Sequence, residues 1–184
     1  MTTRLVLVCH GPTTATRRAA FPDDESIEGA PARLRIRVDL AFTGPAVCCR
    51  QTAAALGLAP RLEARLRECD YGRWRGRTLA ELSDTEPDAV REWLTDPTAT
   101  PHGGESTMDV LARVGGWLDE LPSGRQRIAA VTHPSVIRAA IVHAIRATPE
   151  SFWRIDIAPL SHTVLSGGSA TWTLRSLGRV PDQS

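Results

Sequence analysis

Short apolar runs alternate with stretches of helical periodicity along the chain. Residues 4–9 form an almost continuous apolar run, which is typical of a strand buried on both faces. Residues 106–121 carry apolar side chains on one helical face. The apolar run 127–132 is followed closely by Pro134, a favoured first residue of a helix. The pattern therefore predicts buried strands that lead directly into helices.

The same reasoning, with Gly and Pro as boundary signals, assigns the other elements. Strands are predicted at residues 4–9, 39–43, 127–132, 154–157 and 171–174, with 62–66 as a strand or extended segment and 161–165 as an additional candidate. Helices are predicted at residues 13–20, 46–56, 78–84, 87–94, 106–121 and 134–146, with one or two further turns at 32–37.

This alternation of strands and helices defines the expected architecture. It predicts an α/β protein, a three-layer α/β/α sandwich around a mainly parallel central sheet. The sequence contains no repeat, low-complexity segment or linker that would divide it. Residues 1–184 are therefore expected to form a single domain, long enough to bury a sizeable core.

The charge composition narrows the classes of partner. All 22 basic residues are arginine, against 21 acidic residues, and the net charge is +1. This balance excludes binding of nucleic acid or an anionic membrane through bulk charge, so we expect a small-molecule substrate instead. The absence of lysine excludes Schiff-base chemistry. A phosphate or carboxylate would have to be bound by arginine, histidine or backbone N–H groups.

The N-terminal apolar run indicates the compartment. It spans only residues 5–9, too short for the hydrophobic part of a secretion signal or for a membrane span. We therefore expect a cytoplasmic protein, in which Cys9, Cys48, Cys49 and Cys69 are thiols and not disulfides.

Candidate catalytic groups stand at the ends of predicted strands. His10 follows the strand at residues 4–9, and His133 follows the strand at 127–132. Glu68 lies just after the segment 62–66. Ligands of such sheets bind at the carboxyl ends of the strands. Two imidazoles and a carboxylic acid there indicate covalent catalysis, with a histidine nucleophile and Glu68 as general acid.

Five segments in this order resemble the histidine phosphatase superfamily, which includes cofactor-dependent phosphoglycerate mutase. They are residues 8–11 (Val-Cys-His-Gly), 45–53 (Pro-Ala-Val-Cys-Cys-Arg-Gln-Thr-Ala), 66–76 (Leu-Arg-Glu-Cys-Asp-Tyr-Gly-Arg-Trp-Arg-Gly), 103–106 (Gly-Gly-Glu-Ser) and 131–133 (Val-Thr-His). The resemblance covers about residues 4–145 and implies a phosphoglycerate mutase-like fold.

The resemblance implies a role for each catalytic candidate. His10 would attack phosphorus and carry the phosphoryl group, and Glu68 would protonate the leaving oxygen and later activate water. His133 would donate a hydrogen bond to the phosphoryl oxygens. This chemistry requires no metal and no organic cofactor. The remaining residues expected to contact substrate are Cys9, Gly11, Thr16, Arg17, Cys48, Trp74 and Arg138.

Two positions depart from the family's pattern. Cys9 and Cys48 stand where the family has the arginines that clamp the phosphoryl oxygens. Each such donor is worth about 10²–10³ in rate. The candidate substitutes are Arg17, Arg18, Arg73 and Arg138, of which Arg17 lies one helical turn past the first motif and Arg138 one turn past His133. Thr16 stands where the family often has an asparagine that contacts phosphate.

Three interpretations follow. The first is a phosphatase with substitute clamps. The second is an enzyme that uses His10, His133 and Glu68 on a substrate without phosphate. The third is a binding protein without turnover. A zinc site of Cys9, Cys48 and the two histidines is a minor alternative, because the usual closely spaced cysteine ligands are lacking.

Overall fold

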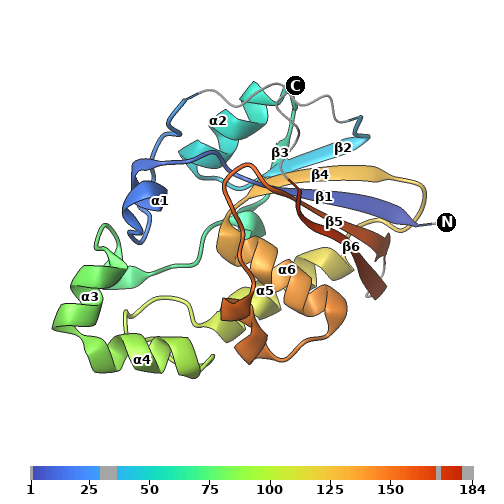
Figure 1. Ribbon diagram of the computed structural model, residues 1–184. Coiled ribbons are helices and arrows are strands. Elements are labelled where there is room, and N and C mark those ends of the chain that lie inside the picture. Colours follow the sequence, from blue (N-terminus) through green and yellow to red (C-terminus); the bar gives the residue numbers. More distant parts are fainter. Residues whose placement is uncertain (1, 30–36, 169–170, 180–184) are drawn as a thin grey trace.

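The computed structural model describes residues 2–29, 37–168 and 171–179, with a six-stranded mixed sheet at its centre (Figure 1). The strands are β1 (Thr3–Cys9), β2 (Leu40–Thr43), β3 (Arg61–Leu62), β4 (Arg127–Thr132), β5 (His162–Gly168) and β6 (Thr171–Arg179). They lie in the order β3-β2-β4-β1-β5-β6. The first four strands of this order are parallel, whereas β5 and β6 run antiparallel along one edge.

Helices cover both faces of this sheet (Figure 1). They are α1 (Thr14–Arg18), α2 (Val47–Ala55), α3 (Leu79–Thr85), α4 (Pro87–Thr95), α5 (Thr107–Asp119) and α6 (Pro134–Ile145). Helix α2 lies on one face, and α5 and α6 lie on the other, which confirms the predicted α/β/α sandwich. Within the part of the chain that the structure describes, no helix is both long and apolar enough to cross a membrane.

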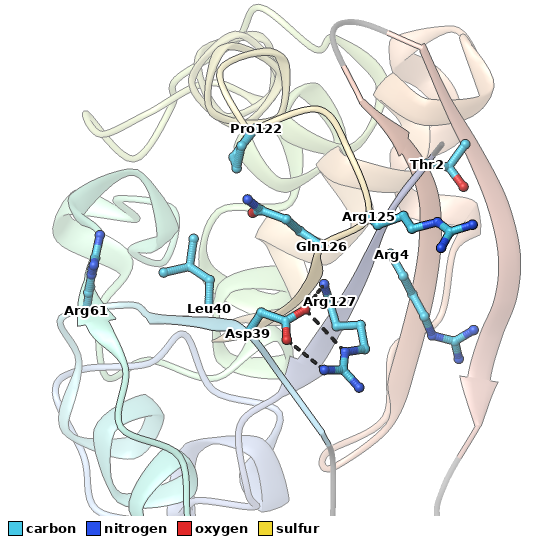
Figure 2. A pocket seen from close by; sticks show the side chains of 9 residues that line it. All are labelled: Thr2, Arg4, Asp39, Leu40, Arg61, Pro122, Arg125, Gln126 and Arg127. Atoms are coloured by element: carbon cyan, nitrogen blue, oxygen red, sulfur yellow. Dashed lines mark hydrogen bonds and ion pairs between the residues drawn. The ribbon is translucent and has the colours of Figure 1, made fainter.

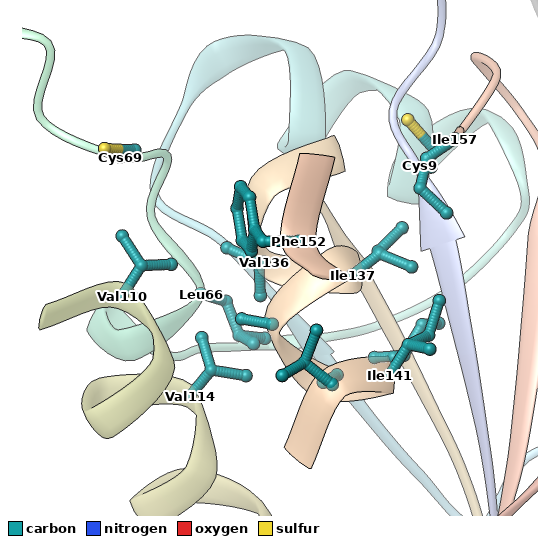
Figure 3. Packing of buried hydrophobic residues seen from close by; sticks show 14 of the residues in the cluster. Cys9, Leu66, Cys69, Val110, Val114, Val136, Ile137, Ile141, Phe152 and Ile157 are labelled. Carbon is teal, nitrogen blue, oxygen red and sulfur yellow. The ribbon is translucent and has the colours of Figure 1, made fainter. Parts of the chain in front are cut away.

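Alternate side chains of β1 enter the two halves of the core. Leu5, Leu7 and Cys9 belong to the larger buried cluster, where side chains of α5 and α6 pack (Figure 3). Val6 and Val8 belong to a smaller cluster that is closed by α2. Because both faces of this central strand are buried, its sequence is an apolar run and not an apolar–polar alternation.

Most predicted elements are confirmed, with ends shifted by a few residues. The strand prediction at 154–157 is wrong: a 3₁₀ turn at Pro149–Arg154 leads into irregular chain, and the strand that pairs with β1 is the additional candidate near 161–165, which is β5. Ile157 is buried there, so the apolar spacing reflects packing of a loop. The Ile155 carbonyl accepts a hydrogen bond from Arg138 and not from a strand.

The predictions for residues 62–66 and 32–37 have different outcomes. Strand β3 contains only Arg61–Leu62 and is followed by a 3₁₀ turn at Ala64–Leu66, so the segment 62–66 is mostly not extended. The side chain of Glu63 accepts the Arg65 N–H and stabilises this turn. The predicted turns at 32–37 lie almost entirely outside the described residues.

Helix α6 provides a matched test of the core. Ile141 is 2% exposed in the larger cluster, whereas Ile145, one turn later, is 51% exposed. Ile141→Ala is expected to lower the free energy of unfolding by about 2–5 kcal/mol because it leaves a cavity. Ile145→Ala should cost less than about 1 kcal/mol. Urea denaturation measures both, and equal losses would contradict this placement of α6.

Candidate active site

Parallel pairing of β1 and β4 places the residues that follow these strands side by side. Cys9 pairs with Thr132 in the strand register, and the His10 N–H donates a hydrogen bond of 2.9 Å to the Thr132 carbonyl. The ring centroids of His10 and His133 are 5.0 Å apart, with an angle of 66° between the rings. Each histidine is 3% exposed. The two strand-end histidines therefore meet at one buried site.

The first histidine has a defined tautomer when it is neutral. Nδ1 of His10 lies 2.7 Å from the Gly11 carbonyl oxygen, which can only accept a hydrogen bond, so Nδ1 carries the proton. The lone pair is then on Nε2. The Gly11 N–H in turn donates to Thr52 Oγ1 at 2.9 Å, and Thr52 donates to the Cys48 carbonyl at 2.7 Å. This chain of hydrogen bonds orients the His10 ring from helix α2.

Glu68 lies next to His133 at the start of helix α6. Its Oε1 accepts hydrogen bonds from the Ser135 hydroxyl and from the Cys69 N–H. Its Oε2 is 3.5 Å from Nδ1 of His133, and that buried nitrogen has no hydrogen-bond partner among the described residues. Burial raises the pKa of Glu68, although the hydrogen bonds from Ser135 and Cys69 oppose the shift. A raised pKa suits a carboxyl group that donates a proton.

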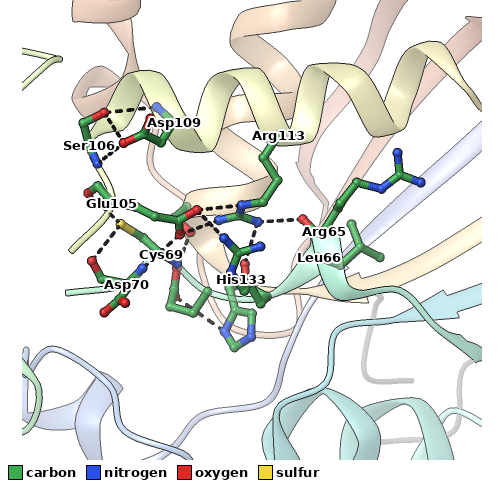
Figure 4. A network of polar contacts seen from close by, with 12 residues as sticks. Arg65, Leu66, Cys69, Asp70, Glu105, Ser106, Asp109, Arg113 and His133 are labelled. Atoms are coloured by element: carbon green, nitrogen blue, oxygen red, sulfur yellow. Dashed lines mark hydrogen bonds and ion pairs between the residues drawn. The ribbon is translucent and has the colours of Figure 1, made fainter. Parts of the chain in front are cut away.

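A buried ion pair anchors the segment that carries Glu68 (Figure 4). The side chain of Arg113 on α5 is 8% exposed and forms two hydrogen bonds of 2.9 Å with the Glu105 carboxylate. Its Nη1 also donates to the carbonyls of Arg65 at 2.6 Å and Arg67 at 3.1 Å. Because these carbonyls come just before Glu68, Arg113 fixes the backbone from which that carboxyl group extends.

The two histidines differ in their tendency to be protonated. Burial lowers the pKa of His133 to about 3, and the neighbouring His10 adds to the shift, so this ring is neutral near pH 7. Burial also lowers the pKa of His10. The hydrogen bond with Cys48 and the negative charge of the Cys48 thiolate raise this pKa by more than burial lowers it, so the net shift is upward. The site therefore combines one neutral imidazole with one that exchanges a proton with Cys48.

The first turn of α2 brings two cysteines to the histidines. Cys49 Sγ is 3.3 Å from Nε2 of His133. A hydrogen bond from Cys49 lowers the pKa of Cys48, and His10 lowers it further against the effect of burial. Burial raises the pKa of Cys49 and of Cys9. Cys48 is thus the thiol of this group that ionises.

Two cavities meet at His10 and Glu68. One, of about 520 Å³, has aromatic walls that include Phe21, Trp93 and Trp153. The other, of about 490 Å³, is lined by His133 and Cys48 together with several acidic side chains and two arginines. Such volumes suit a small-molecule ligand.

Most of the expected substrate-contacting residues lie at these cavities. Thr16, Arg17 and Arg138 line the larger of the two, and Cys48 lines the smaller. Gly11 contributes backbone contacts beside His10.

The two arginines already have partners. Arg17 forms an ion pair with Glu28. Nε of Arg138 donates to the Ile155 carbonyl at 2.7 Å, and its guanidinium lies over the Trp153 ring. Neither arginine is therefore committed to the histidines in this arrangement.

Cys9 and Trp74 lie elsewhere and line neither cavity. Cys9 faces the larger hydrophobic cluster, where it lies near Ile157 (Figure 3). Trp74 is fully buried beside Phe21 and Trp93, behind the wall of the larger cavity. It supports that wall from within the core.

Three site residues were not predicted from the sequence. Ser135 hydrogen-bonds Glu68, Cys49 contacts His133, and Thr52 accepts from the backbone of Gly11. Ser135 and Cys49 are close in sequence to His133 and Cys48, and both stand in the first turn of a helix that begins at the site. Their position next to predicted site residues was the signal in the sequence that could have identified Ser135 and Cys49.

A third cavity, of about 720 Å³, lies at the amino ends of β1 and β4, opposite to the histidines (Figure 2). Its lining includes Arg4, Arg61 and Arg125, and an ion pair of 2.7 Å between Arg127 and Asp39. It contains no histidine, cysteine or hydroxyl group near a base. The candidate catalytic groups lie at the opposite, carboxyl ends of the strands, as expected for this architecture.

The sheet order and the paired histidines at the carboxyl ends of β1 and β4 define an α/β protein with a candidate catalytic site at that end of the sheet. Residues 5–179 match the family described as "Histidine phosphatase superfamily (branch 1)". The chain therefore belongs to the histidine phosphatase superfamily.

Known relatives include several phosphatases. A glucosyl-3-phosphoglycerate phosphatase of Mycobacterium tuberculosis is 33% identical over 120 residues, which cover 64% of this chain and 53% of the relative. Phosphoserine phosphatase 1 of Hydrogenobacter thermophilus is 28% identical over 138 residues, 71% of this chain and 65% of the relative. A bifunctional protein of M. tuberculosis is 36% identical over 113 residues, 59% of this chain. The match spans only 31% of that protein's length.

Solved structures support the same fold. A mycobacterial glucosyl-3-phosphoglycerate phosphatase in complex with VO3 superposes with a TM-score of 0.81 at 26% identity. The superposition covers 95% of this chain and 98% of that one.

The buried ion pair below Glu68 leads to a stability prediction. Arg113→Met should lower the free energy of unfolding by about 1.5–3 kcal/mol, because Glu105 loses two charge-assisted hydrogen bonds and keeps only the more exposed Arg67 and the Asp70 N–H as partners. The double change Arg113→Met with Glu105→Met should restore most of the loss. As a control, Arg91→Met removes an exposed pair with Asp88 and should cost less than about 1 kcal/mol. Urea denaturation of the four proteins tests this, and a double variant that is no more stable than Arg113→Met would contradict it.

Proposed function

We propose that the protein is a phosphomonoester hydrolase that acts on a small molecule through a phosphohistidine at His10. The observation that carries the proposal is the hydrogen bond from Nδ1 of His10 to the Gly11 carbonyl. It leaves the lone pair of the neutral ring on Nε2, at a cavity shared with Glu68. Membership of the histidine phosphatase superfamily and the phosphatase names of the relatives support the same reaction.

In the first half of the reaction, Nε2 of His10 attacks phosphorus and forms an N–P bond while the P–O bond to the leaving alcohol breaks. The carboxyl proton of Glu68 passes to the leaving oxygen. In the second half, the Glu68 carboxylate takes a proton from water, whose oxygen attacks phosphorus and releases inorganic phosphate. His10 and protonated Glu68 are then restored. The raised pKa of Glu68 favours the first proton transfer.

His133 and helix α6 supply the electrostatic environment of the phosphoryl group. A neutral His133 ring donates one N–H without adding a charge. Helix α6 begins at Pro134, so the positive end of its dipole lies beside the same histidine. Together they partly replace the clamping arginines, whose positions hold Cys9 and Cys48.

The cavity with aromatic walls is assigned to the alcohol part of the substrate. It shares His10 and Glu68 with the smaller cavity, so a phosphate at His10 can leave its organic group against Phe21, Trp93 or Trp153. The guanidinium of Arg138 lies at this wall as well. We therefore place substrate selection in this cavity and phosphoryl transfer at the histidines.

Hydrolysis of p-nitrophenyl phosphate by the metal-free protein tests this function. His10→Ala should lower kcat by roughly 10³-fold or more, because it removes the nucleophile. Glu68→Gln should lower kcat by about 10²–10⁴-fold. Quenching with alkaline detergent, in which the N–P bond is stable, should trap a labelled phosphoryl group on wild type and on Glu68→Gln but not on His10→Ala. Turnover that survives His10→Ala would overturn the proposal.

Cys48 favours a second candidate function, because an anionic thiolate at a phosphate-clamp position opposes phosphate binding. This candidate is an enzyme that uses the two histidines and Glu68 on a substrate without phosphate. Cys48→Arg distinguishes the two functions. For a phosphatase it should raise kcat/KM for p-nitrophenyl phosphate by at least about tenfold, since one charge-assisted donor is regained. An unchanged or lower kcat/KM would favour the second candidate.

A further inference from the structure

Three metal-binding side chains converge where the phosphate clamp would lie. One ligand atom from each of His10, Cys48 and His133 lies within 4.8 Å of the other two. They come from three separate segments: the loop after β1, the first turn of α2 and the loop after β4. All three residues are buried. Because its three side chains are buried, this group differs from the exposed clusters of acidic residues that commonly form on protein surfaces without binding a metal.

The side chains around this group already have the arrangement that metal ligands require. A ligating histidine usually donates its other ring N–H to a carbonyl or carboxylate, which fixes the ring and the tautomer. Nδ1 of His10 has this contact with the Gly11 carbonyl, and Nε2 remains as the ligand atom. In the second ring, Nδ1 of His133 has no hydrogen-bond partner within the described parts of the chain, and Nε2 lies 3.3 Å from Cys49 Sγ.

The ligand set selects the metal. Two imidazoles and a thiolate are favoured by zinc, whereas magnesium and calcium prefer oxygen ligands. Zinc bond lengths of about 2.0–2.3 Å require tetrahedral ligands to lie about 3.5 Å apart. The observed limit of 4.8 Å exceeds this by little more than 1 Å, within reach of side-chain rotation.

Three protein ligands leave the fourth zinc position open. His10, Cys48 and His133 all line the cavity of about 490 Å³, so a water molecule or an anion has access to that position. A zinc ion with one thiolate ligand also leaves a net charge of +1 where the family's clamping arginines are missing. The site is therefore electrostatically suited to a metal and an anion together.

We propose that His10, Cys48 and His133 form a zinc site whose fourth position opens into this cavity, and that zinc and a phosphoryl group compete for Nε2 of His10. The ligand set differs from the minor alternative read from the sequence, because Cys9 is not part of the group. The binding site is independent of the proposed function, whereas the competition depends on it.

Metal titration of the reduced, EDTA-treated protein tests the site. Co²⁺ should bind with one equivalent, with visible d–d absorption of tetrahedral type and a near-ultraviolet band from a thiolate–cobalt bond. Zn²⁺ should displace it and raise the melting temperature. Cys48→Ser should lose the thiolate band, and its Zn²⁺ affinity should fall by more than the roughly 10–100-fold that changes outside the ligand set cause. His133→Ala should lose affinity similarly.

Cys69→Ser is the matched control, because Cys69 is a buried thiol outside the three-residue group. It should keep the cobalt spectrum and the zinc affinity of the wild type. Circular dichroism and the metal-free melting temperature establish that each variant is folded, and Cys48→Ala provides a second variant if Cys48→Ser is not. Equal affinity of wild type and a folded Cys48 variant, or no saturable binding, would overturn the proposed site.

Activity separates the site from the proposed function. Zn²⁺ should inhibit hydrolysis of p-nitrophenyl phosphate by wild type and should lower the yield of labelled phosphoenzyme, and EDTA should reverse both effects. A protein that binds Zn²⁺ without any turnover retains the site and refutes the phosphatase. A protein that hydrolyses the ester but shows no cobalt spectrum refutes the site alone. Tight zinc binding without inhibition refutes the competition for Nε2.

Discussion

The parallel hydrogen bonding of β1 to β4 is the interaction on which the rest of the site depends. The six paired positions from Arg4 to Cys9 hold the ends of the two strands level, so that His10 and His133 leave the sheet at the same height. Helices α2 and α6 then start beside these residues. Their first turns deliver Cys48 and Ser135 to the histidines. The site is thus a direct product of strand register.

Burial gives the groups at this edge their individual properties. An imidazole without a counter-charge stays neutral when water is removed, as His133 does, and a carboxylic acid holds its proton more firmly, as Glu68 does. Cys48 behaves differently because Cys49 and His10 stabilise its negative charge. The resulting pocket contains the carboxyl group of Glu68, the neutral ring of His133 and the Cys48 thiolate beside the His10 imidazole. Which group pairs with the Cys48 thiolate decides which ligands the pocket binds.

Most of the sheet, its helices and the two strand-end histidines could be predicted, because each depends on local sequence and on the rule that parallel strands share one end. The contacts around them could not. Ser135 hydrogen-bonds Glu68, and the backbone before Glu68 is held by Arg113 of α5, which is distant in sequence from both residues. Trp74 belongs to an aromatic cluster assembled from distant segments, so its place in a loop after Glu68 misleads. Neither relation leaves a mark in local sequence.

The alternation of β1 between the two layers has a consequence for how the gene can vary. Odd-numbered side chains from Leu5 to Cys9 pack under α6, and the even-numbered Val6 and Val8 pack under α2. Loss or gain of one codon within this strand would exchange the two sets and turn His10 away from His133. Substitutions between apolar residues leave this arrangement intact. Evolution can therefore exchange one apolar residue for another in β1. A change in the length of β1 would instead remove the site.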